Sequence, residues 1–201
     1  PEIKTIAVIG AGQMGRGIAQ VAAQADLEVK LADIDLTAAV RGKEVIAKGL
    51  NKLIAKEKIT EVVRDAILEK ISPVDGIPSL TDVDFVVEAA TENETLKLKI
   101  FEALDKAVGP EVVLASNTSS ISITRIASAV SNPERVIGMH FMNPVPIMKL
   151  VEIIRGVTTS DEVYQDTLAL AAELNKVTVT SLDYAGFIVN RILMPMLNEA
   201  A

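Results

Sequence analysis

Two spacings of apolar residues alternate along the chain, one typical of buried strands and the other typical of amphipathic helices. Short apolar runs rich in Val and Ile predict strands at residues 3–9, 28–33, 83–88, 112–115, 135–141, 151–154 and 177–180, and those at 3–9 and 83–88 are typical of buried strands. Helical spacing predicts the intervening helices, at residues 18–25, 36–71, 94–108, 122–130, 161–174 and 187–201. Pro195 is expected to interrupt the last helix, and residues 72–81 are expected to form a loop. This alternation favours an α/β fold, a doubly wound and mostly parallel sheet of the Rossmann type.

Residues 36–71 are longer than the single helix that joins two strands in an ordinary dinucleotide-binding fold. A break near Thr60, a good N-cap residue, divides them into two helices and predicts a helical-hairpin insertion. One face of this hairpin is open to two interpretations, a solvated and salt-bridging surface or a contact for a phosphate-bearing ligand. Its residues recur at intervals of four and are Glu44, Lys48, Lys52 and Lys56.

A glycine-rich turn directly follows the first predicted strand. Its residues are Gly10, Ala11, Gly12, Gln13, Met14 and Gly15. The first glycine permits a tight turn, the second lets the backbone approach a pyrophosphate, and the third lets the helix pack closely on the strand. The N–H groups at the start of the helix then face the phosphates. Asp33, at the end of the second strand, is placed to bind a ribose 2′-hydroxyl and would repel a 2′-phosphate, so the sequence predicts NAD as the cofactor.

Composition narrows the class of protein. The 201 residues are 49% hydrophobic, which supports a substantial core, and no apolar run approaches the length of a membrane span. The chain has no cysteine and one histidine, so disulfides and a metal site are not expected. A net charge of −7 argues against nucleic acid as a partner. We expect a cytoplasmic enzyme without a nucleic-acid or membrane partner.

Polar side chains gather where the predicted strands end, at the edge where open parallel sheets bind ligands. His140 is the only histidine, and on an apolar strand it is either a packed structural residue or the proton partner of a nicotinamide cofactor. Glu152, on the following strand between apolar neighbours, would orient the imidazole if the two side chains meet. The other polar residues at these strand ends are Glu92, Lys97, Asn117, Ser119 and Asn143.

Four motifs, taken in order, resemble those of the L-3-hydroxyacyl-CoA dehydrogenase family, and especially its small bacterial 3-hydroxybutyryl-CoA dehydrogenases. The resemblance covers essentially the whole chain. The motifs are SNTSS at residues 116–120, GMHFMNPVP at 138–146, KLVE at 149–152 and GFIVNR at 186–191.

The resemblance implies a function and a role for each candidate residue. The activity would be NAD-dependent oxidation of L-3-hydroxyacyl-CoA to 3-ketoacyl-CoA and its reverse, with a short-chain substrate such as 3-hydroxybutyryl-CoA, as in fatty acid β-oxidation. His140 would be the general base and acid, and Glu152 would hold its imidazole. Ser119 and Asn190 would bind the reacting oxygen or its neighbours, with Asn143 in the same pocket. The remaining contacts implied are those of Glu92, Lys97 and Ser119 with the NAD ribose and nicotinamide regions, of Asp33 with the adenine ribose, and of Lys56 with the CoA phosphates.

The resemblance also implies a division into two domains. Residues 1–184 would be the NAD-binding Rossmann domain, and residues 185–201 would begin an all-helical C-terminal domain that forms a homodimer and closes over the acyl chain. The sequence departs from the family at Ala185, where a proline is common, and it ends at Ala201 inside the first helix of that domain. An exposed apolar surface, with self-association or instability, is therefore expected.

Two alternatives stay open at this point. An NAD-dependent dehydrogenase of a free hydroxy acid would not need the basic face of the hairpin, so CoA would give it no rate advantage. A nucleotide-binding fragment without activity would bind NADH and turn nothing over.

Overall fold

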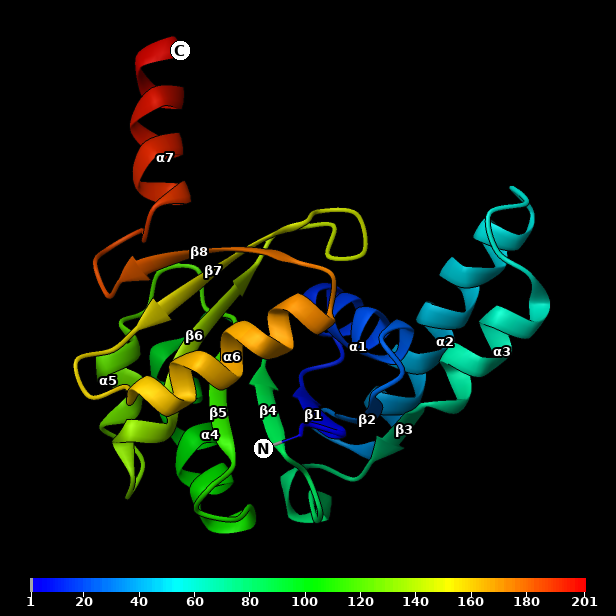
Figure 1. Ribbon diagram of the computed structural model, residues 1–201, viewed down its shortest axis with the longest axis horizontal. Helices are drawn as coiled ribbons and strands as arrows, with labels where there is room; N and C mark the ends of the chain where they lie inside the picture. Colours follow the sequence, from blue (N-terminus) through cyan, green and yellow to red (C-terminus); the bar gives the residue numbers. More distant parts are fainter. Residues whose placement is uncertain (1) are drawn as a thin grey trace.

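A single eight-stranded sheet forms the centre of the protein, with the strands in the order β3-β2-β1-β4-β5-β6-β7-β8. The computed structural model describes residues 2–201, and Figure 1 shows their arrangement. Neighbouring strands are parallel except for β6 and β7, which are antiparallel. The strands are β1 (Thr5–Ile9), β2 (Glu28–Ala32), β3 (Ile71–Val74), β4 (Phe85–Glu88), β5 (Val113–Ser116), β6 (Val136–Phe141), β7 (Leu150–Arg155) and β8 (Val177–Leu182).

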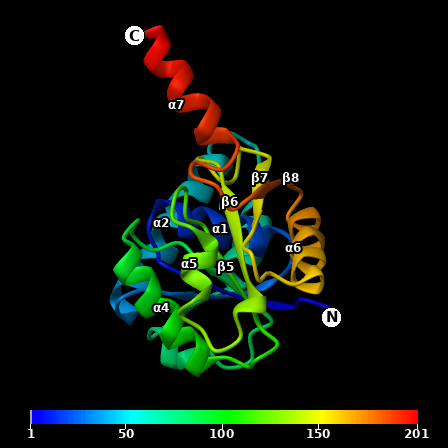
Figure 2. The same ribbon diagram turned by 90° about the vertical axis from the view of Figure 1, so that its left-hand side faces the viewer.

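Helices cover both faces of the sheet, as Figure 2 shows from the side. The helices are α1 (Gln13–Gln24), α2 (Leu36–Ile54), α3 (Glu61–Glu69), α4 (Glu94–Ala107), α5 (Ile123–Ala127), α6 (Asp161–Glu173) and α7 (Val189–Ala200), with short 3₁₀ turns at Ile77–Ser79 and Pro133–Arg135. The predicted doubly wound, mostly parallel α/β fold is therefore confirmed. Within residues 2–201, no helix is both long enough and apolar enough to cross a membrane.

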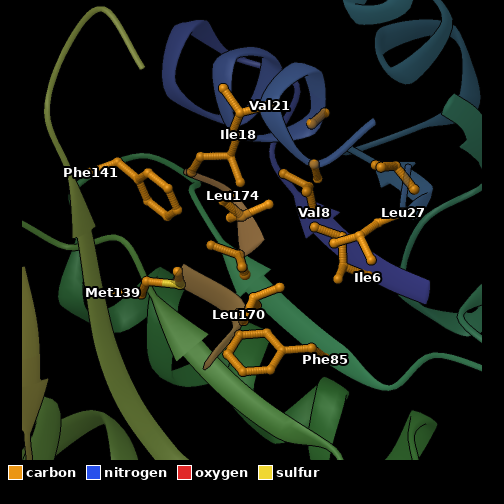
Figure 3. Packing of buried hydrophobic residues seen from close by; sticks show 14 of the residues in the cluster. Ile6, Val8, Ile18, Val21, Leu27, Phe85, Met139, Phe141, Leu170 and Leu174 are labelled. Atoms are coloured by element: carbon orange, nitrogen blue, oxygen red, sulfur yellow. The ribbon is translucent and has the colours of Figure 1, made fainter. Parts of the chain in front are cut away.

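Two apolar cores lie between the sheet and its helices, one on each face of the sheet. On one face, side chains of β1 and β4 pack against α1 and α6, and Figure 3 shows Ile18, Phe85 and Leu170 in this cluster. On the other face, Phe101 of α4 and Ile123 of α5 pack against the opposite side of the same sheet. Because successive side chains along a strand point to opposite faces of the sheet, the central strands contribute to both cores and are buried throughout.

The helical-hairpin insertion is present, and its two helices are α2 and α3. The break between them lies where the sequence predicts it, and the Thr60 hydroxyl caps α3 by accepting a hydrogen bond from the Val63 N–H at 3.3 Å. The tip of the hairpin and α7 project from the same side of the molecule (Figure 1). The face that carries Lys48 and Lys52 is exposed, and among residues 2–201 neither side chain forms an ion pair.

Two expectations about local structure were wrong. Residues 72–81 do not form a loop throughout, because Ile71–Val74 is strand β3, paired in parallel with β2. Pro73 is compatible with that strand because β3 lies at the edge of the sheet, where a missing N–H breaks no ladder. Pro195 does not interrupt the last helix, since α7 continues through it from Val189 to Ala200. No residue of α7 is buried, so water can satisfy the carbonyl that the proline leaves without a donor.

Candidate active site

The glycine turn between β1 and α1 has the geometry of a phosphate cradle. Gly10 has φ of 101°, and its N–H donates to the Ala32 carbonyl at 2.8 Å. A Cβ on Gly10 would lie 2.7 Å from the Ala89 oxygen, and one on Gly15 would lie 1.7 Å from the Gly10 oxygen, so the fold itself requires both glycines. A Cβ on Gly12 would meet no atom within 4 Å. Gly12 therefore leaves open space at the start of α1, where unpaired N–H groups favour an anion.

Asp33 stands beside this turn at the end of β2. Its carboxylate accepts hydrogen bonds from the Ala11 N–H at 2.5 Å and from the Ile34 N–H at 2.6 Å. Asp33, Gly10 and Gly12 line a cavity of 710 Å³ whose other walls are largely apolar, including Ile77, Pro78, Leu96 and Ile100. We call it the cofactor cavity, because an acid beside the glycine turn and an apolar slot next to it suit the ribose, diphosphate and base of an adenine dinucleotide.

A second cavity of 520 Å³ adjoins the first, and Ala89 and Ala90 line both. We call it the catalytic cavity. It brings together side chains from α1, β6, α7 and the loops after β4, β5 and β6, which are far apart in the sequence. Those with predicted roles are Met14, Glu92, Ser119, His140, Asn143 and Asn190.

His140 and Glu152 meet because β6 and β7 are antiparallel and place the two residues directly opposite each other. The distance from His140 Nδ1 to Glu152 Oε2 is 2.7 Å, and the side chains are 10% and 0% exposed. The other carboxylate oxygen of Glu152 accepts the N–H groups of Ile188 and Val189, each at 2.9 Å. The Phe187 ring packs against the imidazole in an edge-to-face arrangement, with 5.9 Å between ring centroids. With Nδ1 occupied by Glu152, Nε2 is the ring nitrogen that remains for a ligand in the catalytic cavity.

Hydrogen bonds also connect Ser119, Asn143 and Asn190 to neighbouring parts of the site. Asn190 Nδ2 donates to the Ser119 carbonyl at 3.3 Å, which joins α7 to the loop after β5. Gln13 Nε2 donates to Asn143 Oδ1 at 3.1 Å, so the start of α1 contacts the loop after β6. These bonds bring the glycine turn and the catalytic residues into one site.

Glu92 accepts several hydrogen bonds from the loop after β5. The donors are the Thr118 hydroxyl, the Ser119 N–H at 3.1 Å and the Ser120 hydroxyl at 3.2 Å, and Lys97 Nζ lies 3.8 Å away. Partial burial acts to raise the pKa of Glu92, but these donors and the Lys97 charge hold it below the ordinary carboxyl value. Glu92 is therefore an anion at neutral pH, oriented at the wall of the catalytic cavity.

Lys97 is less accessible than its predicted role suggests. Its side chain is 1% exposed, and Nζ donates to Glu88 Oε1 at 2.6 Å and to the Ala90 carbonyl at 3.2 Å. A direct contact with the cofactor stays a prediction. Sequence reasoning missed Glu88 itself, although an acid closing an apolar strand nine residues before a lysine is a readable signal.

Lys56 lies apart from both cavities. It follows the end of α2 at the tip of the hairpin, is exposed and lines neither of them. The structure therefore does not join it to the catalytic residues, and its predicted contact with CoA phosphates would involve a part of the ligand that extends out of the cavity.

Comparisons of the sequence and of the structure with known proteins lead to the same family. Residues 5–184 match the family described as 3-hydroxyacyl-CoA dehydrogenase, NAD binding domain. The chain is 47% identical over 199 residues to a probable 3-hydroxybutyryl-CoA dehydrogenase of Bacillus subtilis, covering 99% of this chain and 69% of that protein. It is 50% identical over 193 residues to a similarly named protein of Deinococcus radiodurans, covering 96% of this chain and 69% of that protein. The crystal structure of (S)-3-hydroxybutyryl-CoA dehydrogenase from Ralstonia eutropha superposes with a TM-score of 0.96 at 48% identity, covering 99% of this chain and 70% of that one.

Proposed function

The chain belongs to the 3-hydroxyacyl-CoA dehydrogenase family, and from this premise we propose that His140 and Glu152 carry out the proton transfer of its reaction. The protein is an NAD-dependent oxidoreductase that interconverts L-3-hydroxyacyl-CoA and 3-ketoacyl-CoA. The observation that supports the assignment is the buried 2.7 Å contact between His140 and Glu152 at the wall of a cavity that adjoins the one beside the glycine turn.

The residues present fit NAD. Gly12 leaves the start of α1 open to a diphosphate, and the Asp33 carboxylate lies in the same cavity, where a ribose hydroxyl can donate to it. NAD, when bound, supplies the hydride acceptor for oxidation of the substrate carbon.

The protein's own part of the reaction is the movement of one proton. In the oxidation direction, His140 Nε2 accepts the proton of the substrate 3-hydroxyl, and in the reverse direction it returns that proton to the ketone oxygen. Glu152 accepts a hydrogen bond from Nδ1–H and stabilises the positive charge that forms on the ring. Because Glu152 is buried and also held by two backbone N–H groups, the imidazole keeps one orientation through the cycle. Ser119 and Asn190 would hydrogen-bond the reacting oxygen or its neighbours, and Asn143 lines the same cavity.

The substrate we propose is a short acyl-CoA such as 3-hydroxybutyryl-CoA, because the relatives described above carry that name. The pantetheine and nucleotide part would extend toward the hairpin, where Lys56 and its neighbour Lys52 offer positive charge to the CoA phosphates. A cytoplasmic location stays a prediction of the sequence.

We also propose that residues 185–201 begin a helical unit separate from the NAD-binding domain and that this unit takes part in a homodimer. Support comes from α7, which projects from the body and exposes half or more of the side chains of Ile192, Met194, Met196 and Leu197 (Figure 2). Apolar surface of this kind is typical of an interface. Light scattering behind a size-exclusion column tests this, and a strictly monomeric protein at micromolar concentration would contradict it.

The direct test of function is oxidation of NADH with acetoacetyl-CoA, measured for the protein and for His140→Gln. We expect turnover that falls by at least about a hundredfold in the variant, while NADH binding is retained. Free acetoacetate, run in parallel, distinguishes the acyl-CoA substrate from a free acid. Equal rates with acetoacetate and acetoacetyl-CoA would contradict the proposed substrate, and equal rates for His140→Gln and the unchanged protein would contradict the role of His140.

A further inference from the structure

A fully buried carboxylate, that of Glu88, lies at the carboxyl end of β4, and the next two residues, Ala89 and Ala90, line both the cofactor and the catalytic cavity. Glu88 is 0% exposed, and each of its oxygens is bound. Oε1 accepts from the Ala90 N–H at 2.7 Å and from Lys97 Nζ at 2.6 Å, and Oε2 accepts from the Ser116 hydroxyl at 2.7 Å. The carboxylate thus joins β4, β5 and α4 at one point.

The ion pair of Glu88 and Lys97 is an unusual choice for a purely structural contact. Two full charges lose their hydration when they are buried, and apolar residues of similar size would hold the two elements together at least as well. We therefore looked for a role of the pair in the backbone that it contacts.

The pair binds both polar backbone groups of Ala90, its N–H and its carbonyl. Glu88 accepts the Ala90 N–H, and Lys97 donates to the Ala90 carbonyl at 3.2 Å. Ala90 and its neighbour Ala89 line both cavities. The Ala89 carbonyl also lies so close to Gly10 that a Cβ there would approach it to 2.7 Å. The segment fixed by the pair is thus part of the wall that the two cavities share.

The positive charge of Lys97 also reaches the catalytic cavity. Its Nζ is 3.8 Å from a carboxylate oxygen of Glu92, which lines that cavity and whose pKa this charge helps to lower. Loss of Glu88 would leave Lys97 without its nearest counter-ion and free to shift toward Glu92.

We propose that Glu88 is a positioning residue for the cofactor, acting through Ala90 and Lys97 on the segment between the two cavities. The inference rests on the proposed function, because it assigns Glu88 a role toward the NAD of that reaction. The proposal predicts that substitution of Glu88 weakens cofactor binding, and that this effect can be separated from any loss of stability.

The test compares Glu88→Gln with the double variant Glu88→Gln/Lys97→Met, measuring both the melting temperature and NADH affinity by fluorescence titration. Glu88→Gln leaves Lys97 buried without its nearest counter-ion, so it should lower the melting temperature by several degrees and weaken NADH binding about tenfold. The double variant removes both charges and should recover most of the melting temperature. It should not recover NADH affinity, because the methionine side chain donates nothing to the Ala90 carbonyl and the cation facing Glu92 is gone.

Two controls keep the result interpretable. Asp105→Asn breaks the pair of Asp105 with the buried Arg135, 2.7 Å apart, which lines neither cavity, and it should lower the melting temperature without changing NADH affinity. Ser116→Ala removes one of the three hydrogen bonds to Glu88 and is mild enough to fold if Glu88→Gln does not; it should weaken NADH binding a few-fold.

Recovery of NADH affinity together with the melting temperature in the double variant would overturn the proposal and make the pair a structural staple. Unchanged affinity in Glu88→Gln, or in Ser116→Ala if the former does not fold, would overturn it as well. Because NADH binding is measured without substrate, absence of acetoacetyl-CoA turnover in the unchanged protein would contradict the proposed function and leave this test intact.

Discussion

The three glycines in the turn after β1 have different physical roles, as the motif predicts. Gly10 and Gly15 make room for neighbouring backbone, whereas the space beside Gly12 is empty of protein atoms. Gly12 thus borders the cofactor cavity, and the fold itself does not require a glycine there.

This difference predicts opposite outcomes for two alanine substitutions. Gly12→Ala should keep the melting temperature and weaken NADH binding about tenfold, because the methyl group enters space needed by the diphosphate. Gly15→Ala should destabilise the fold by about 3 kcal/mol, because its Cβ overlaps the Gly10 carbonyl. Gly49→Ala, at an equally open but exposed helical site remote from both cavities, is the matched control and should leave NADH affinity unchanged. Equal affinity in Gly12→Ala and the unchanged protein would refute the role of Gly12.

At the scale of elements, the segment between β8 and α7 is anchored to α5 by a single carboxylate. Asp183 accepts the Ser122 hydroxyl at 2.7 Å and the N–H groups of Ile123 and Thr124 at 2.9 and 2.8 Å. Burial acts to raise the pKa of Asp183, but these donors hold it below the ordinary value of 3.8.

The sign of this shift defines a pH dependence. A carboxyl whose pKa is lower in the folded state stabilises the fold above its unfolded pKa, and this contribution is lost as the pH falls below 3.8 and through the folded value. Asp183→Asn should therefore lower the free energy of unfolding by about 1 kcal/mol at pH 7, with the difference shrinking in acid. Urea unfolding of both proteins at pH 7 and near pH 3 measures it, and a difference that does not shrink in acid would exclude Asp183 as the cause.

The sequence predicts the type of most elements here because the buried strands are apolar and their breaks carry Gly, Pro or capping residues. It fails at β3, whose Pro73 suggests a loop unless the strand is known to lie at the sheet edge. Glu88 was also missed: an acid that closes an apolar strand can be noticed in the sequence, but its bonds to α4 and β5 are known only once those elements are in place. The pairing of His140 with Glu152 depends in the same way on the antiparallel register of β6 and β7, which spacing alone leaves open.

At the scale of the whole molecule, the two cavities share Ala89 and Ala90 but depend on different lengths of the chain. The cofactor cavity is built from residues before position 104, whereas the catalytic cavity also needs Val189, Asn190 and Leu193 of α7. No residue of α7 is buried, so its removal leaves both apolar cores intact.

A variant ending at Ile188 should therefore separate the two activities. We expect it to bind NADH within a few-fold of the unchanged protein and to lose acetoacetyl-CoA turnover by at least about a hundredfold, because it lacks Asn190 and one donor to Glu152. Fluorescence titration and NADH oxidation measure the two quantities. Turnover that survives the deletion would show that α7 has no part in the chemistry.

The two oxygens of Glu152 serve different parts of the protein, one the imidazole of His140 and the other the backbone at the start of α7. A favourable effect of one site on another is reciprocal in free energy. If docking of α7 prepares His140 for substrate, then substrate in the catalytic cavity must strengthen the docking of α7 by the same amount. The amide hydrogens of Ile188 and Val189 should then exchange with deuterium more slowly in the ternary complex than in the free protein, so that the start of one helix reports on the occupancy of the active site.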